Sequence, residues 1–128
     1  MMADTDTRMP AGLSGLKILV VEDEVAISML LEDMLLDFGS EVVGPAGRLA
    51  QAVQLAESAS FDLAILDVNL AGEPIYPVVD VIARRGIRFL FSTGYGAAGI
   101  DGAWKDRPVL QKPFSQAELE RALTAALA

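Results

Sequence analysis

From residue 17 onward, the hydrophobic residues follow two alternating spacings. Runs such as Lys17–Val21 and Leu63–Leu66 are apolar without polar alternation, which is typical of strands buried on both faces of a sheet. Other segments repeat apolar residues every three or four positions, as the buried side of a helix requires. We therefore expect strands at Lys17–Val21, Glu41–Gly44, Leu63–Leu66, Ile87–Ser92 and from Val109 to Leu110. Helices are expected at Val25–Phe38, around Leu49–Ala56, at Pro77–Arg85 and after Ser115. Strands that alternate with helices predict an α/β fold with a doubly wound, five-stranded parallel sheet.

Residues at the helix ends support this division. Gly39 and Gly86 follow two of the expected helices, where glycine readily adopts the conformation that ends a helix. Ser115 and Glu118 form an S-x-x-E capping box before the last apolar stripe. By contrast, Gly94–Arg107 has four glycines in fourteen residues where a fourth helix is due. Each interior glycine costs about 1 kcal/mol relative to alanine, so we expect this helix to be short or frayed.

Composition narrows the possible functions. The chain has 128 residues, of which 52% are hydrophobic, enough for one domain with a single core. It contains no cysteine and no histidine, which excludes disulfides, thiolate or histidine metal sites and Ser-His-Asp catalysis. A net charge of −8 argues against nucleic acid and anionic membranes as partners. A metal bound by this chain would have oxygen ligands, as magnesium, calcium and manganese do.

The first fifteen residues resemble neither a helix nor a signal peptide. They carry two acids, a proline and two glycines without an apolar core. No run approaches the roughly 18 apolar residues of a membrane span. We expect a flexible tail over residues 1–15, one domain over residues 16–128, and a soluble cytoplasmic protein. The chain ends after the last expected helix, so we expect no output domain to follow.

Reactive side chains follow four of the expected strands. Glu22 and Asp23 come after the first strand, Asp67 after the third, Thr93 after the fourth and Lys112 after the fifth. In a doubly wound sheet the carboxyl ends of the strands form the ligand-binding edge. Considered singly, each residue has a commoner structural explanation, such as a helix cap, β propensity or a Lys-Pro turn. Their joint occurrence at strand ends favours one site.

The chemistry of such a site follows from the charges. Carboxylates that are held together repel one another, and a hard divalent cation relieves the repulsion, which suits magnesium. Beside a bound cation, a central carboxylate can attack a phosphoryl group. Lys112 and Thr93 are the cation and the hydroxyl donor that the remaining phosphoryl oxygens would need.

The order and spacing of these residues resemble the receiver domain of two-component response regulators. The resemblance covers Lys17–Ala128 and rests on Glu22-Asp23, Asp67 after LAIL, Thr93 and Lys112-Pro113-Phe114. The segment FSTGYG and the segment DVNL also resemble the FATGUY subgroup of single-domain receivers. The resemblance implies a flavodoxin-like (βα)5 fold with strand order 2-1-3-4-5.

The resemblance also implies a role for each residue. Asp67 would accept a phosphoryl group from a phosphohistidine on a sensor histidine kinase or histidine phosphotransfer protein. Asp23, Asp67 and the carbonyl of Asn69 would bind Mg²⁺ directly, and Glu22 through water. Thr93 would follow the phosphoryl group, Lys112 would pair with it, and the Lys112–Pro113 bond would be cis. Such a domain is no enzyme beyond its own phosphorylation and dephosphorylation, and it would signal through a partner protein or act as a phosphate sink or relay.

The chain departs from the usual receiver pattern at three positions. Glu22 stands where aspartate is more usual, Ala71 where many receivers have proline, and Val109 where a switch aromatic is typical. Because Val109 is too small to fill the space that Thr93 would vacate, we predict that Tyr95 is the moving aromatic. On this hypothesis, residues 94–107 are mobile until phosphorylation or a partner orders them.

Three other functions fit part of the pattern. Gly94–Gly99 matches the G-x-G-x-x-G dinucleotide fingerprint, but it follows the fourth strand and opens no convincing helix. An aspartate-nucleophile phosphatase has an acid two residues after its nucleophile, where this chain has Asn69, whose amide is no general acid. A pseudo-receiver, which is an interaction module without phosphorylation, is the alternative that Glu22 and Val109 leave open.

Overall fold

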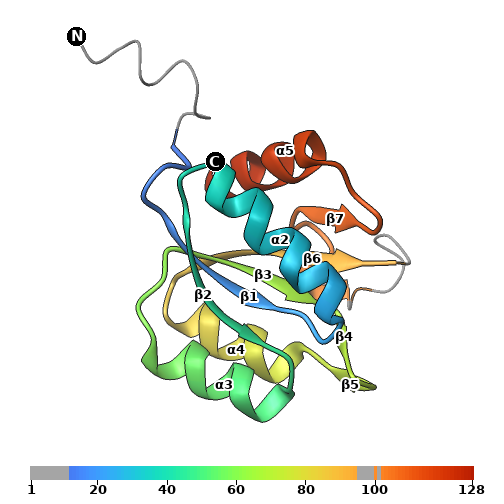
Figure 1. The fold of residues 1–128 in the computed structure, drawn as a ribbon. Helices are drawn as coiled ribbons and strands as arrows, with labels where there is room; N and C mark the ends of the chain where they lie inside the picture. The colour runs from blue at the N-terminus through green and yellow to red at the C-terminus, as the bar shows by residue number, and fades with distance from the viewer. Residues whose placement is uncertain (1–11, 95–99, 101) are drawn as a thin grey trace, which may run out of the picture.

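A computed structural model describes residues 12–94, 100 and 102–128. Its centre is a parallel sheet of five strands in the order β2-β1-β3-β6-β7 (Figure 1). These strands are β1 (Lys17–Val21), β2 (Glu41–Ala46), β3 (Leu63–Asp67), β6 (Arg88–Thr93) and β7 (Val109–Gln111). When only the strands of this sheet are numbered along the chain, the order is 2-1-3-4-5. The predicted doubly wound α/β fold is therefore confirmed.

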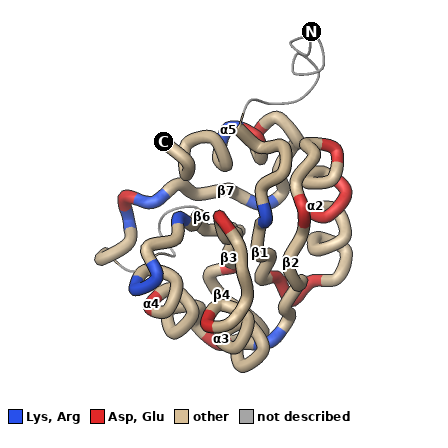
Figure 2. Tube along the Cα trace, turned by 90° about the vertical axis from the view of Figure 1, so that its left-hand side faces the viewer, with Lys and Arg blue, Asp and Glu red and all other residues tan. Residues whose placement is uncertain are grey.

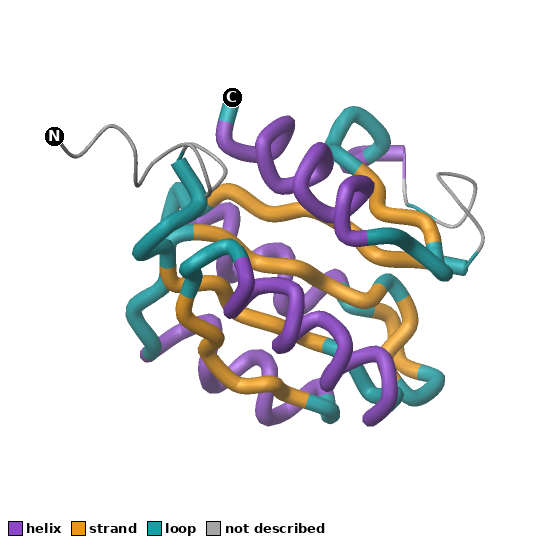
Figure 3. The backbone as a smooth tube through the Cα atoms, turned by 45° about the horizontal axis from the view of Figure 1, so that its top comes forward, coloured by secondary structure: helices purple, strands orange, loops and turns teal. Residues whose placement is uncertain are grey.

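Helices cover both faces of the sheet (Figures 1 and 3). The helices among the described residues are α2 (Val25–Asp37), α3 (Leu49–Ser58), α4 (Tyr76–Arg84) and α5 (Gln116–Leu127). Along β3, Leu63 and Ile65 face the core beneath α2 and α5, whereas Ala64 and Leu66 face the core beneath α3 and α4. Both sets are buried because successive strand residues point to opposite faces. This explains why β3 is hydrophobic without alternation.

Local signals at the helix ends act as the sequence predicted. Ser115 Oγ accepts a hydrogen bond from the Glu118 N–H, and the Glu118 carboxylate accepts one from the Ser115 N–H. This reciprocal capping box fixes the start of α5. Gly39 has a φ of 82° just after α2, which is the left-handed conformation that glycine adopts most readily.

A short hairpin follows β3 that the sequence analysis did not predict. Strand β4 (Asn69–Leu70) pairs antiparallel with β5 (Glu73–Pro74). The two residues between them, Ala71 and Gly72, have φ values of 52° and 88°, as a tight two-residue hairpin turn requires. Proline is locked near a φ of −65°, so this turn explains why the chain does not carry proline at position 71.

The expected boundary of the domain needs a correction. Residues 12–15, assigned above to a tail, pack against the turn after α2. Leu13 is fully buried, its carbonyl accepts a hydrogen bond from Ser40 Oγ at 2.7 Å, and the Gly15 N–H donates to the Gly39 carbonyl at 2.8 Å. Burial of an apolar side chain holds this segment on the domain. Residues 1–11 lie outside the described residues.

The glycine-rich segment is described only in part. Between Gly94 and Arg107, residues 95–99 and 101 lie outside the described residues, and the prediction for Tyr95 falls there. In the described remainder the only regular element is a three-residue 3-10 helix, Gly102–Trp104, which agrees with the expected short helix.

Charged residues are unevenly distributed over the domain. Acidic residues lie along α2, and basic residues lie at the end of α4 and just before β7 (Figure 2). Among the described residues, no helix combines the length and the apolar character needed to cross a membrane.

Candidate functional site

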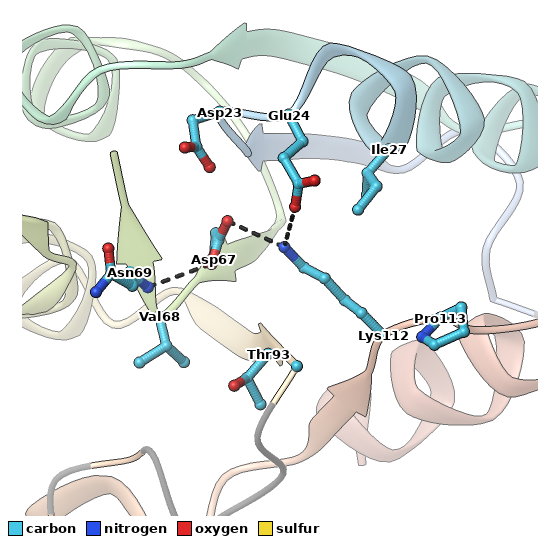
Figure 4. A pocket seen from close by; sticks show the side chains of 10 residues that line it. Asp23, Glu24, Ile27, Asp67, Val68, Asn69, Thr93, Lys112 and Pro113 are labelled. Carbon is cyan, nitrogen blue, oxygen red and sulfur yellow. Dashed lines mark hydrogen bonds and ion pairs between the residues drawn. The ribbon is translucent and has the colours of Figure 1, made fainter. Parts of the chain in front are cut away.

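The carboxyl ends of the strands border a pocket of about 930 Å³ (Figure 4). Of the predicted site residues that the structure describes, all except Glu22 line this pocket. The lining residues are Asp23, Glu24, Ile27, Asp67, Val68, Asn69, Thr93, Gly94, Lys112 and Pro113. Parallel strands that end at one edge bring these residues together, although they are far apart in the sequence. The pocket is therefore where the sequence analysis expected a ligand.

Three acidic side chains converge at this edge of the sheet, and two of them line the pocket. Carboxylate oxygens of Glu22, Asp23 and Asp67 lie within 4.8 Å of one another. Backbone N–H groups orient them: Asn69 donates to Asp67 Oδ1 at 3.2 Å and Ala71 donates to Asp23 Oδ2 at 3.1 Å. The hairpin thus positions two of the three carboxylates, because both N–H groups come from residues 69–71.

Lys112 is the cation of the site. Its Nζ atom lies 2.9 Å from Glu22 Oε1, 3.0 Å from Asp67 Oδ2 and 3.6 Å from Glu24 Oε1. The Lys112–Pro113 bond is cis, which confirms the expectation from the sequence. The Lys112 N–H also donates to the Thr93 carbonyl at 2.9 Å, so β6 and β7 meet directly beside the pocket.

The electrostatic environment changes the pKa of Asp67. Burial raises the pKa of Asp67 from 3.8 to about 7, and the negative charge of Glu22 adds to the increase. The hydrogen bond and positive charge of Lys112 oppose it. Burial alone would lower the pKa of Lys112, but its hydrogen bonds to Glu22 and Asp67 outweigh burial and raise this pKa. Excess negative charge therefore surrounds one ammonium group.

This arrangement fits a hard divalent cation. Several carboxylate oxygens within a few ångströms, beside an open pocket, are the ligands that magnesium prefers. A cation there would relieve the repulsion between Asp67 and its acidic neighbours. The side-chain oxygen of Asn69 accepts a hydrogen bond from the Gly72 N–H at 2.8 Å. Coordination by the Asn69 carbonyl remains a prediction.

Thr93 and Glu24 complete the rim of the pocket. Thr93 is buried at the end of β6, and Figure 4 shows it on the opposite side of Lys112 from Glu24. The sequence analysis missed Glu24 as a site residue. The sequence hints at Glu24 only because it is the third acid of the run Glu22-Asp23-Glu24. Only the fold shows that its carboxylate lies beside Lys112.

Comparison with known proteins identifies the family. Residues 18–124 match the family model of the response regulator receiver domain, so the chain belongs to this family. Among curated proteins, the transcriptional regulatory protein PdtaR of Mycobacterium tuberculosis is 31% identical over 97% of this chain. TcrA, from the same organism, is 36% identical over 97% of this chain. The chain spans 60% of PdtaR and 54% of TcrA.

Solved structures show the same fold and match over nearly their whole length. The solution structure of SdrG from Sphingomonas melonis Fr1 has 43% identity and a TM-score of 0.81, covering 89% of this chain and 98% of SdrG. The receiver domain of the sensor histidine kinase PA1611 from Pseudomonas aeruginosa PAO1 has 27% identity and a TM-score of 0.72, covering 89% of this chain and 98% of that domain. That receiver domain holds a magnesium ion in its active-site cleft.

Proposed function

We propose that the chain is a phosphoacceptor receiver in which Asp67 takes a phosphoryl group from a phosphohistidine in a Mg²⁺-dependent reaction. The observation that carries this proposal is the position of Asp67, which lines the pocket, lies beside the other two acids of the cluster and contacts Lys112. An oxygen of the Asp67 carboxylate attacks phosphorus as the P–N bond to the donor imidazole breaks. The imidazole nitrogen keeps that electron pair, and an acyl phosphate forms on Asp67.

The neighbouring residues bind the metal ion and the phosphoryl oxygens. Asp23 and Asp67 would hold Mg²⁺ directly and Glu22 would hold it through water, and a bound ion would neutralise the charge on the carboxylate and phosphoryl oxygens. Lys112 is close enough to Asp67 to pair with a phosphoryl group there. Thr93 lines the same pocket and can donate its hydroxyl to a phosphoryl oxygen. The domain catalyses only its own phosphorylation and dephosphorylation.

A protein donor has to cover the pocket to deliver its phosphohistidine. Helix α2 begins at the pocket and carries four large apolar side chains exposed to solvent, namely Val25, Met29, Leu30 and Leu36. Exposed apolar residues on one helix beside a reactive site favour a protein partner. We propose that a sensor histidine kinase or histidine phosphotransfer protein docks there, and that the phosphorylated domain then acts on a partner protein or as a sink or relay.

The Asp67→Asn substitution tests this function directly. It should abolish Mg²⁺-dependent labelling by a phosphohistidine donor and by acetyl phosphate, because the amide cannot form the acyl phosphate. The matched control is Asp80→Asn, which removes an exposed acid on α4 and should leave labelling unchanged. Circular dichroism checks that both variants fold. Full labelling of Asp67→Asn would contradict the assignment.

A further inference from the structure

We propose that Glu24 regulates phosphorylation by competing with the incoming phosphoryl group for Lys112. This inference rests on the proposed function of Asp67. In the unphosphorylated domain Glu24 pairs with the Lys112 ammonium at the pocket, and the pair must open before a phosphoryl oxygen can take that position. Glu24 is thus a positioning residue for Lys112 that slows phosphorylation by anionic donors.

The geometry separates Glu24 from the other two partners of Lys112. The side chains of Glu22 and Asp67 are 1% and 9% exposed, whereas that of Glu24 is 62% exposed. Its Oε1 atom lies 3.6 Å from Lys112 Nζ, and the carboxylate borders the pocket with that ammonium (Figure 4). Of the three carboxylates that contact Lys112, that of Glu24 is therefore the one that is already solvated and can move away from the ammonium without rearrangement of the buried acids.

The Glu24 side chain does not cap helix α2, although it stands at the helix N-terminus. Glu24 occupies the N-cap position of α2, where a short polar side chain usually accepts a hydrogen bond from the first turn. The Glu24 side chain makes no such bond. Its carboxylate points to Lys112 instead (Figure 4), so the contact with the ammonium is the interaction that the structure gives this side chain.

The charge balance explains why the contact would slow the reaction. Three acidic side chains, Glu22, Glu24 and Asp67, contact one ammonium, and a fourth, Asp23, lies beside Glu22 and Asp67. The proposed Mg²⁺ ligands include Asp23 and Asp67 but not Glu24, so the charge of Glu24 remains when the metal is bound. An anionic phosphoryl donor meets this charge at the mouth of the pocket and competes with it for Lys112.

The central experiment compares Glu24→Gln with Asp33→Asn, which removes an exposed acid farther along α2. At saturating Mg²⁺ and low ionic strength, Glu24→Gln should raise the second-order rate constant for acetyl phosphate about two- to fivefold, as removal of an exposed ion pair allows. The gain should shrink in 0.5 M salt because exposed charges are screened. Asp33→Asn should match the wild type. Equal rates for Glu24→Gln and the wild type, or an equal gain in Asp33→Asn, would overturn the proposal.

A second variant tests whether reach to Lys112 matters. Glu24→Asp keeps the negative charge but shortens the side chain by one methylene, so its contact with the ammonium is lost. We expect the rate to rise in this variant too, by less than in Glu24→Gln. A Glu24→Asp rate equal to that of the wild type, alongside a faster Glu24→Gln, would mean that charge alone acts and would overturn the competition for Lys112.

Binding of inorganic phosphate separates this inference from the proposed function. Phosphate binding to the Mg²⁺-loaded protein, followed by NMR, needs no covalent step on Asp67. Glu24→Gln should bind phosphate about two- to fivefold more tightly than the wild type. If no donor labels any variant but phosphate binding tightens, the acceptor function fails, whereas the competition of Glu24 with phosphate for Lys112 stands. If the wild type is labelled but neither rate nor phosphate affinity changes in Glu24→Gln, the role of Glu24 alone fails.

Discussion

At the scale of single residues, Asp67 lies between groups of opposite sign. Burial and Glu22 favour its protonated form, whereas Lys112 favours the carboxylate. The charge of the Asp67 carboxyl group in the folded protein therefore depends on what binds at the pocket. A cation or a change of partner for Lys112 shifts this balance, since both act on the charged form alone.

The pKa of Asp67 predicts how stability changes with pH. Because the folded-state pKa of about 7 exceeds the ordinary value of 3.8, the folded protein binds a proton more tightly than the unfolded chain. In metal-free buffer, the contribution of Asp67 to the free energy of unfolding should be fully present below pH 4 and fall as pH rises toward 7. At about 1.4 kcal/mol per pKa unit, the upper limit of this loss is about 4 kcal/mol.

Urea denaturation in the presence of a chelator, at pH 5 and at pH 7.5, measures the larger part of this loss. Asp67→Asn has no carboxylate to titrate, so its free energy of unfolding should fall less between these two pH values than that of the wild type. Both proteins share all other titrating groups. If the free energy of unfolding depends on pH identically in the two proteins, the charge of Asp67 does not destabilise the folded state.

At the scale of elements, a strand and a hairpin turn each contain a glycine with a similar backbone conformation but different surroundings. Gly44 in β2 and Gly72 in the β4–β5 turn have φ values of 91° and 88°. A Cβ atom at Gly44 would lie 2.9 Å from the Ala46 nitrogen and 3.2 Å from the Val20 carbonyl oxygen. At Gly72 a Cβ atom would meet nothing within 4 Å. An added methyl group therefore has no room at Gly44 in β2 but has open space at Gly72 in the hairpin.

This difference predicts unequal costs for the same substitution. Gly72→Ala should lower the free energy of unfolding by about 1–2 kcal/mol, the cost of a left-handed backbone with a side chain. Gly44→Ala should add the cost of a clash with backbone atoms, a further 1–3 kcal/mol or so. Urea denaturation of the two variants measures both effects. Equal losses would mean that β2 relaxes around the added methyl group.

At the scale of the whole molecule, the proposed metal site joins the ends of β1 and β3. A ligand that binds only the folded state stabilises it in proportion to the logarithm of its concentration, by about 2.7 kcal/mol at 100 times Kd. The melting temperature should therefore rise with Mg²⁺ concentration. The increase should be larger than any effect of matched ionic strength from a monovalent salt.

The proposed set of Mg²⁺ ligands also predicts which acidic residues contribute most to Mg²⁺ binding. Asp23→Asn should remove most of the Mg²⁺-dependent increase in melting temperature, because it removes a direct ligand. Glu22→Gln should remove less, because a contact through water is easier to replace. Asp80→Asn, on α4 away from the pocket, should keep the full increase. Equal losses from Asp23→Asn and Glu22→Gln would count against the proposed coordination.

The sequence alone determined the elements and the edge at which the site lies. Hydrophobic spacing is a local property that depends on whether a segment is a strand or a helix, so β1, β3, β6 and α5 were predicted nearly to the residue. The alternation of strands and helices then fixed which ends of the strands meet. For that reason Asp67, Thr93 and Lys112 could be placed together before any distance was known.

Only the tertiary structure decided the contacts between segments. Lys112 reaches Asp67 across 45 positions of the chain, and Ser40 holds Leu13 across 27. The spacing of apolar residues holds no information on such pairs, because side-chain packing and rotamers set them. The same reason explains why the sequence analysis missed the contact of Glu24 with Lys112, the packing of residues 12–15 and the raised pKa of Asp67. Each depends on through-space burial and charge, which exist only once distant parts of the chain have come together.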